Sequence, residues 1–228
     1  MDITIRFGQV DIEPVDCIHD LGVLLDSSLS KHQHIARVTS ACFFIFDGFT
    51  SSATYPVLDI YAWKWLVCAV ILTSVDYCNS ALAGLSDSAL APLPRILHAA
   101  ARFVWDLRPW DHITVALQTL HWLLMHQHIT YKLCTMMHGV AFVYAPSYLL
   151  HAAVPLSTLP GRAHLWSADN EQYDVPQMSS SVGSRALFVA GPRAWNQLLI
   201  SLHQRHCIET FKRNLKAEIF MDSFCESE

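Results

Sequence analysis

The stretch RILHAAARFVWDL, residues 95–107, decides the fold class of this chain. Its apolar side chains recur at the three- and four-residue intervals of an α-helix. One stripe runs through Leu97, Ala100 and Val104, and Leu93, just before the stretch, extends it. Arg95, His98 and Arg102 share another face of the same helix. One apolar and one basic face predict a helix that packs on other helices and presents cations to solvent.

Helical spacing continues on both sides of this stretch, with turn-rich segments between the helices. The further expected helices are 27–46, 58–75, 115–124, 127–143 and 207–220. Glycine, proline and serine clusters predict loops at 47–56 and 76–94. Four prolines between residues 144 and 190 predict an irregular arm.

The N-terminal residues alternate in polarity with a period of two, which is typical of strands. Ile3, Ile5 and Phe7 begin this pattern, a turn at Gly8 follows, and a third apolar run covers 18–25. These three short strands are followed by no further predicted strands that would complete a sheet. We therefore expect the edge of a larger sheet, an exposed edge that promotes aggregation, and low solubility.

Together these patterns predict a mainly α chain with four parts. A β hairpin or sheet edge covers 1–26, a helical bundle 27–143, an irregular arm 144–206, and a C-terminal helix and tail 207–228.

Composition limits the functions open to this chain. Of its 228 residues 52% are hydrophobic and only 15% are charged, so apolar surface that another protein should cover is expected. The net charge is −5, with a balance of −6 over residues 1–90 and +1 over 91–228. Nucleic-acid binders are usually basic, so this balance argues against strong binding to nucleic acid.

The cysteines and the N-terminus favour an intracellular protein, nuclear or cytoplasmic. The seven cysteines are scattered and odd in number, and MDITIRFGQVD has no signal-peptide pattern. The most apolar run, Trp65–Val75, is shorter than the roughly 20 residues of a membrane span. A buried core helix is therefore the favoured interpretation, with a membrane segment as the alternative.

Catalytic signatures are missing from the sequence. We find no adjacent aspartates of the polymerase type, no GxxxxGK(S/T) loop, no GxGxxG and no HExxH. The 13 histidines include clusters that could reach one metal ion, at His32/His34, His126/His128, Cys134/His138 and His203/His206/Cys207. Without a CxxC or a matching second pair, we expect no metal site, no cofactor and no enzyme.

Basic and aromatic side chains offer the remaining candidate sites. Arg95, His98 and Arg102, like Lys212–Lys216, are either phosphate-contacting or ordinary solvated helix faces. Trp105, Trp122 and Trp195 could stack on bases but more often anchor a helical core.

An ordered set of stretches resembles the thumb and post-thumb part of the reverse transcriptase of non-LTR retrotransposons, the LINE elements of jockey-like type. The set begins with DLGVLLDSSL at 20–29 and VDYCNSALAGL at 75–85. It continues with HAAARFVW at 98–105, DHIT at 111–114, LHWLL at 120–124, ITYKL at 129–133, APSYL at 145–149, FVAGPRAWNQL at 188–198 and FKRNLK at 211–216. Each stretch alone is weak, whereas their order over nearly the whole chain is specific.

The resemblance implies part of an RNA-directed DNA polymerase whose catalytic aspartates lie upstream of the DLGV stretch. What could carry over is a thumb that holds an RNA/DNA duplex by its phosphates, at most weakly. The candidate contacts are Arg95, Arg102, Lys132, Arg193, Lys212, Arg213 and Lys216. The missing palm or another protein would cover the apolar surface.

Departures from the family pattern suggest two other interpretations. Residues 43–66 fit poorly, His126, His128 and Trp166 stand where arginine is usual, and Leu124 and Leu199 stand where proline is usual. Each exchange is one transition in codons beginning CG or CC, so a translated, decaying copy without function is one hypothesis. A host-adopted protein that binds a partner or a membrane surface through apolar helices is the other.

Overall fold

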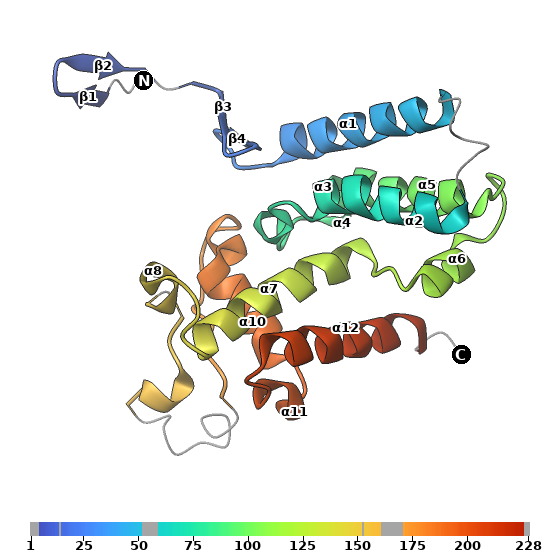
Figure 1. Ribbon diagram of the computed structural model, residues 1–228. Coiled ribbons are helices and arrows are strands. Elements are labelled where there is room, and N and C mark those ends of the chain that lie inside the picture. Colours follow the sequence, from blue (N-terminus) through green and yellow to red (C-terminus); the bar gives the residue numbers. More distant parts are fainter. Residues whose placement is uncertain (1–4, 14, 52–58, 152, 161–170, 226–228) are drawn as a thin grey trace.

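The computed structural model describes residues 5–13, 15–51, 59–151, 153–160 and 171–225 (Figure 1). The fold is mainly α, as the periodicity predicted, with its named strands before residue 27. The longer helices are α1 (His32–Ser51), α2 (Ile60–Val67), α5 (Pro92–Trp105), α6 (Ile113–Leu120), α7 (Met125–Ala141), α10 (Leu187–Asn196) and α12 (Ile208–Cys225). One-turn helices are α3 (Thr73–Asp76), α4 (Asp87–Leu90), α8 (Ser147–Leu150) and α11 (Ile200–His203).

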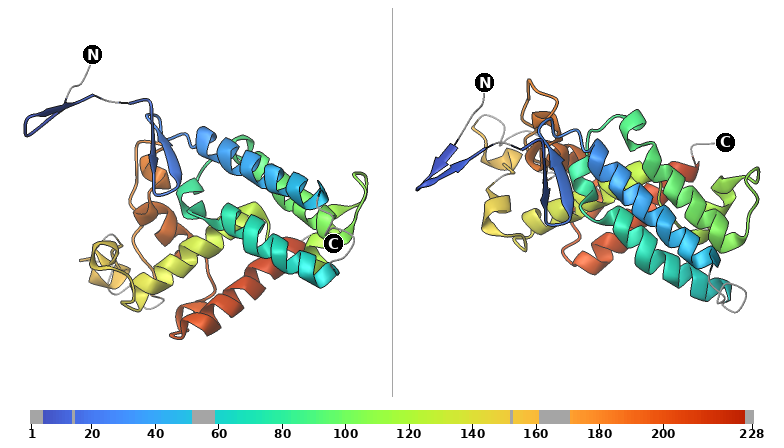
Figure 2. Two further views of the ribbon diagram at one scale, coloured as in Figure 1. Left: turned by 45° about the horizontal axis from the view of Figure 1, so that its top comes forward. Right: turned by 90° about the horizontal axis from the view of Figure 1, so that it is seen from above.

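The N-terminal segment forms two separate antiparallel hairpins instead of three strands of one sheet. Strand β1 (Ile5–Phe7) pairs with β2 (Val10–Ile12), and β3 (Cys17–Asp20) pairs with β4 (Val23–Asp26). The apolar run 18–25 is thus a hairpin by itself, and Ile3 lies outside the described residues. The first hairpin extends away from the helices (Figures 1 and 2).

Tyr77, a residue of the helical part of the chain, holds the turn of the second hairpin in place. Gly22 has a φ of +83°, and a Cβ there would come within 3.1 Å of the Tyr77 ring. The Tyr77 hydroxyl donates a hydrogen bond of 2.5 Å to the Leu21 carbonyl. A side chain at position 22 would therefore strain the backbone and crowd Tyr77.

Helix α1 begins five residues later than predicted, at His32, and ends five residues later, at Ser51, because tertiary packing overrides its glycine. The expected loop at 47–56 is wrong for residues 47–51, which are helical; residues 52–58 lie outside the described part. Phe49 packs with Trp63 and Phe103 at ring-centroid distances of 5.6 and 5.9 Å. These contacts extend the helix past Gly48, which costs about 1 kcal/mol in a helix interior.

The expected loop at 76–94 is also partly wrong. It contains a 3-10 turn at Asn79–Leu82, helix α4, and the first turn of α5, which begins at Pro92. Prolines are tolerated in a first turn because those amides have no acceptor within the helix.

The apolar run Trp65–Val75 forms a helical segment that is buried on one face only. Helix α2 continues through a π-helical turn, Cys68–Leu72, into α3. Val67, Ile71 and Val75 are buried, whereas Trp65 is 76% exposed. Among the described residues, no helix has both the length and the apolar character needed to cross a membrane.

Helix α7 lies at the centre and joins the N- and C-terminal halves. It packs on α10 and α12, while α1, α2 and α5 form a layer on its other side (Figure 1). A Cβ at Gly191 of α10 would lie 2.9 Å from the sulfur of Met137 on α7. The glycine therefore allows the two helices to approach closely.

The expected irregular arm, 144–206, is correct only for its first part. The described residues of 144–186 form turns, the one-turn helix α8 and short 3-10 turns, whereas α10 and α11 are helical, and Pro192 lies inside α10. Asn196 holds the turn region by exchanging hydrogen bonds of 2.9 and 2.7 Å with the backbone of Tyr173. Trp166 lies outside the described residues.

Candidate nucleic-acid interface

The structure distributes the predicted cations over four helices. Helix α5 carries Arg95 and Arg102, α7 carries Lys132, α10 carries Arg193, and α12 carries Lys212, Arg213 and Lys216. Figure 1 shows α5 and α12 in different layers, on either side of α7. The cations therefore form local groups.

Arg95 and Arg102 line one hollow of about 330 Å³, together with His98. The hollow exists because α5 ends at Asp106, whose φ of 48° reverses the chain and lets the Leu107 amide donate to the Arg102 carbonyl at 2.9 Å. Leu107 then forms the opposite wall. We call this site, lined by Arg95, His98, Ala99, Arg102, Leu107 and Pro109, the α5 hollow.

The α5 hollow has the electrostatics of an anion site. The Nε of Arg102 is buried and has no hydrogen-bond partner within the described part of the chain. Burial, followed by the charge of Arg102, lowers the pKa of His98. At neutral pH the positive charge of the hollow therefore comes from the two guanidinium groups, whose donors fit carboxylate or phosphate oxygens.

One contact beside the hollow was missed by the sequence reasoning. The guanidinium carbon of Arg108 lies 5.8 Å from the centre of the Trp110 ring, which is 73% exposed. In the sequence, only the proximity of Arg108 and Trp110 on either side of Pro109 could have indicated this contact. An exposed indole beside cations is a surface on which a base can stack.

The basic face of α12 is partly neutralised. Lys212 lies 3.4 Å from the Glu209 carboxylate, so these two side chains form an ion pair one helical turn apart. Arg213 and Lys216 are exposed. An exposed pair of this kind contributes little to stability, but it reduces the local positive charge.

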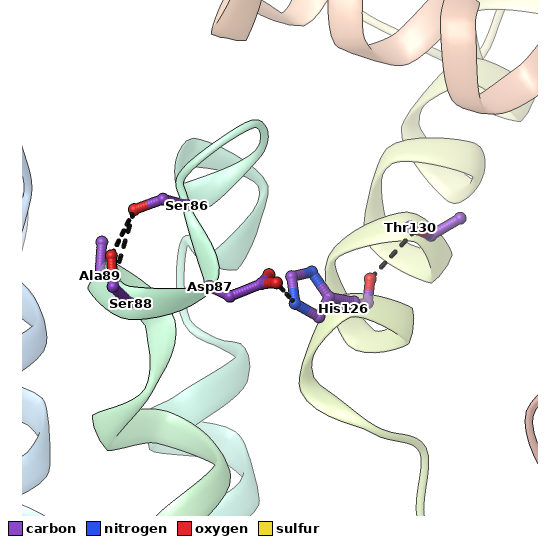
Figure 3. Close-up of polar contacts among 6 residues, drawn as sticks. All are labelled: Ser86, Asp87, Ser88, Ala89, His126 and Thr130. Carbon is purple, nitrogen blue, oxygen red and sulfur yellow. Dashed lines mark hydrogen bonds and ion pairs between the residues drawn. The ribbon is translucent and has the colours of Figure 1, made fainter.

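Arg193 lines a second groove, of about 200 Å³, between α7, α10 and the segment before α4. His126 in this groove has its Nε2 3.0 Å from the Asp87 carboxylate, and the Thr130 hydroxyl donates to the His126 carbonyl at 3.1 Å (Figure 3). Asp87 itself follows Ser86, the N-cap residue of α4. The carboxylate beside His126 makes this groove a poor phosphate site. Lys132 is exposed elsewhere on α7.

Two of the three candidate stacking tryptophans are core residues. Trp195 is fully buried and Trp122 is 5% exposed, as the core interpretation predicted. Trp105, at the end of α5, is 38% exposed. Only this last indole could reach a ligand from solvent.

The candidate metal ligands do not assemble. Cys134 and His138 are both buried in α7, and His128 Nδ1 contacts the Asp76 carboxylate at 2.7 Å. Among the residues that the structure describes, no three histidine, cysteine or acidic side chains gather closely enough to hold an ion.

Comparisons with known proteins give no match, whether to a family model, a curated protein or a solved structure. Two polar side chains of the ordered stretches have structural roles. Asn79 is 1% exposed and donates to Asp76 at 3.1 Å, and the Trp195 indole donates to the Glu171 carbonyl at 3.0 Å. These residues are therefore explained by packing and hydrogen bonding within the fold.

Proposed function

We propose that this chain is a non-catalytic, thumb-like piece of a retrotransposon reverse transcriptase that binds RNA/DNA duplex weakly through backbone phosphates. The observation that carries the proposal is the α5 hollow, where the side chains of Arg95 and Arg102 line one depression. Phosphate oxygens suit the guanidinium groups that these two arginines present there. The ordered sequence stretches support the same function, because HAAARFVW forms most of this helix.

The spacing of the two arginines suits a nucleic-acid strand. Arg95 and Arg102 are two helical turns apart, a rise of about 10 Å along the helix axis. Successive nucleotides of one strand rise about 3.4 Å, so the pair spans roughly three phosphates. The net charge of −5 and the pairing of Lys212 with Glu209 argue that binding is weak.

Fluorescence anisotropy with a labelled RNA/DNA hybrid tests this proposal. With two phosphate contacts, the logarithm of the affinity should fall with the logarithm of salt between about 50 and 200 mM with a slope near −2. Arg95→Gln combined with Arg102→Gln should abolish the slope. Arg37→Gln, which removes an exposed cation of α1, is the matched control and should bind like the wild type. An unchanged slope in the double variant would refute the proposal.

A second function has its own observation. Phe44 of α1 and Tyr61 and Trp65 of α2 are 80%, 71% and 76% exposed. Such aromatic side chains favour an interaction protein that uses apolar helices to bind a partner or a membrane surface. Association that is insensitive to salt, and is lost in Trp65→Ser, would support this function over duplex binding.

The decaying-copy hypothesis is supported by two backbone angles. Leu124 and Leu199, which stand where the family has proline, have φ values of −72° and −59°. Both lie in the narrow range that proline imposes. An intact coding segment, free of shared disruptions in related genomes, would argue against decay.

A further inference from the structure

A second cationic cavity, separate from the α5 hollow, lies where distant parts of the chain meet. It has a volume of about 400 Å³ and two charged lining residues, Lys31 and Arg185. Its walls are otherwise largely apolar and include Leu29, Met136 and Leu187. The cavity joins the turn before α1, the middle of α7 and the start of α10.

The backbone around Lys31 is held in a costly conformation. Leu29 and Lys31 have φ values of 52° and 64°, a region that non-glycine residues rarely adopt. The Asp26 carboxylate stabilises this turn by accepting from the amides of Ser30 and Lys31 at 2.9 and 3.1 Å. Its pKa is lowered, first by the Ser28 hydroxyl and then by the Ser30 amide. Strain of this kind is often found at binding sites.

The side chains of Lys31 and Arg185 have N–H donors that could bind an anion. The Arg185 guanidinium donates to the carbonyls of Ser181 and Leu29, at 3.2 and 3.3 Å, which fixes its orientation and leaves further N–H groups free of these bonds. Lys31 is 8% exposed. Burial lowers the pKa of Lys31, the charge of Asp26 opposes this, and Arg185 lowers it further.

The Asp26 carboxylate offsets part of the charge on Lys31, and an anion between Lys31 and Arg185 would also offset the repulsion between these two cations. We propose that this cavity binds a small amphipathic carboxylate, with its anionic head between Lys31 and Arg185 and its hydrocarbon body against Leu29, Met136 and Leu187. The volume is at the small end of the range of about 300–1,000 Å³ for small-molecule sites. The apolar walls suit a hydrocarbon body better than a fully hydrated inorganic ion. The proposal does not depend on duplex binding.

Calorimetric titration of the full chain with decanoate, below the concentration at which it forms micelles, tests this site. The wild type should bind one decanoate, and decanol should bind at least about tenfold more weakly, which corresponds to about 1.4 kcal/mol. Lys31→Met and Arg185→Met keep most of the apolar stem and should each lose about tenfold in affinity or more. Lys132→Met, on the exposed side of α7, is the matched control and should retain binding.

A measurement on the wild-type chain tests the proposal without variants, whose folding could be altered. Acetic anhydride labelling followed by mass spectrometry should show that decanoate protects Lys31 and leaves Lys132 and Lys216 unchanged. Equal binding of decanol and decanoate, unaltered affinity in Lys31→Met, or no protection of Lys31 would each overturn the proposal.

Discussion

Acid should destabilise this fold through His138, a fully buried histidine of α7. Its Nε2 lies 2.7 Å from the Arg205 carbonyl oxygen. A carbonyl can only accept, so Nε2 carries the proton in the neutral ring. The other nitrogen, Nδ1, is buried without a hydrogen-bond partner among the described residues. Phe142 and Phe211 flank the ring at centroid distances of 4.5 and 4.4 Å.

Burial lowers the pKa of His138 below its ordinary 6.5; the hydrogen bond to Arg205 opposes this, and the charges of His206 and Lys212 add to it. Above pH 6.5 both folded and unfolded chains hold the ring neutral. As the pH falls below 6.5, the unfolded chain binds a proton first, so stability falls until the folded pKa is reached. If the folded ring stays neutral, the loss one pH unit below 6.5 is at most about 1.4 kcal/mol. For a chain of this size that corresponds to about 3–6 °C in Tm.

Thermal melts of the wild type and His138→Phe at about pH 7.5 and 5.5 measure this contribution. The substitution removes a hydrogen bond worth about 1 kcal/mol and an unpartnered buried nitrogen that costs about 1–3 kcal/mol. At the higher pH its Tm should therefore match or exceed that of the wild type, and its loss on acidification should be smaller.

His34 and His98, whose pKa values burial also lowers, are present in both proteins and cancel in the comparison. His32→Phe, at the exposed start of α1, serves as the control and should behave like the wild type. If His138→Phe loses as much stability on acidification as the wild type, His138 does not stay neutral and the reasoning is wrong.

Three further changes should alter the free energy of unfolding measured in urea. Asp26→Ala removes the acceptor for Ser30 and Lys31, and should cost about 1–2 kcal/mol, as for the loss of a helix cap. Trp195→Phe loses the hydrogen bond to the Glu171 carbonyl and part of a fully buried ring, and should cost about 1–3 kcal/mol. A change of stability within about 0.5 kcal/mol would mean that the turn region does not contribute to the core. Leu199→Pro should stabilise the chain by about 0.4–1 kcal/mol, because the φ of −59° already suits proline. Destabilisation would show that the hydrogen bond of 3.4 Å from the Leu199 amide to the Glu218 carboxylate contributes more than the proline does.

Helical periodicity predicted the elements whose packing is local in sequence. The stripe through Leu97 and Val104 is buried in α5, as expected. The prediction failed where a distant contact outweighed a local signal. Phe49 extends α1 past Gly48 by packing on Phe103, and the end of the expected irregular arm is helical where α10 packs closely on α7 at Gly191. Such contacts join segments that are too far apart in the sequence for a local pattern to predict them.

The candidate sites divide in the same way. Arg95 and Arg102 share a face because they are seven residues apart on one helix, so spacing alone predicted their proximity. The opposite wall of their hollow depends on the left-handed turn at Asp106, which the sequence did not indicate. Lys31 and Arg185 meet only in the folded chain, and each was an ordinary isolated cation in the sequence.

The net charge of −5 limits long-range attraction to nucleic acid, but it does not decide whether an anion binds in a particular cavity. Exposed charges are screened over about 8 Å at physiological salt, whereas charges removed from water are screened much less. Arg95 is exposed beside the α5 hollow, while Lys31 is 8% exposed in its cavity. Anion binding at the α5 hollow should therefore weaken with salt, with the slope near −2 expected for two phosphate contacts, and carboxylate binding beside Lys31 should change little. The salt dependence thus separates the two sites even in the wild-type chain, where both are present together.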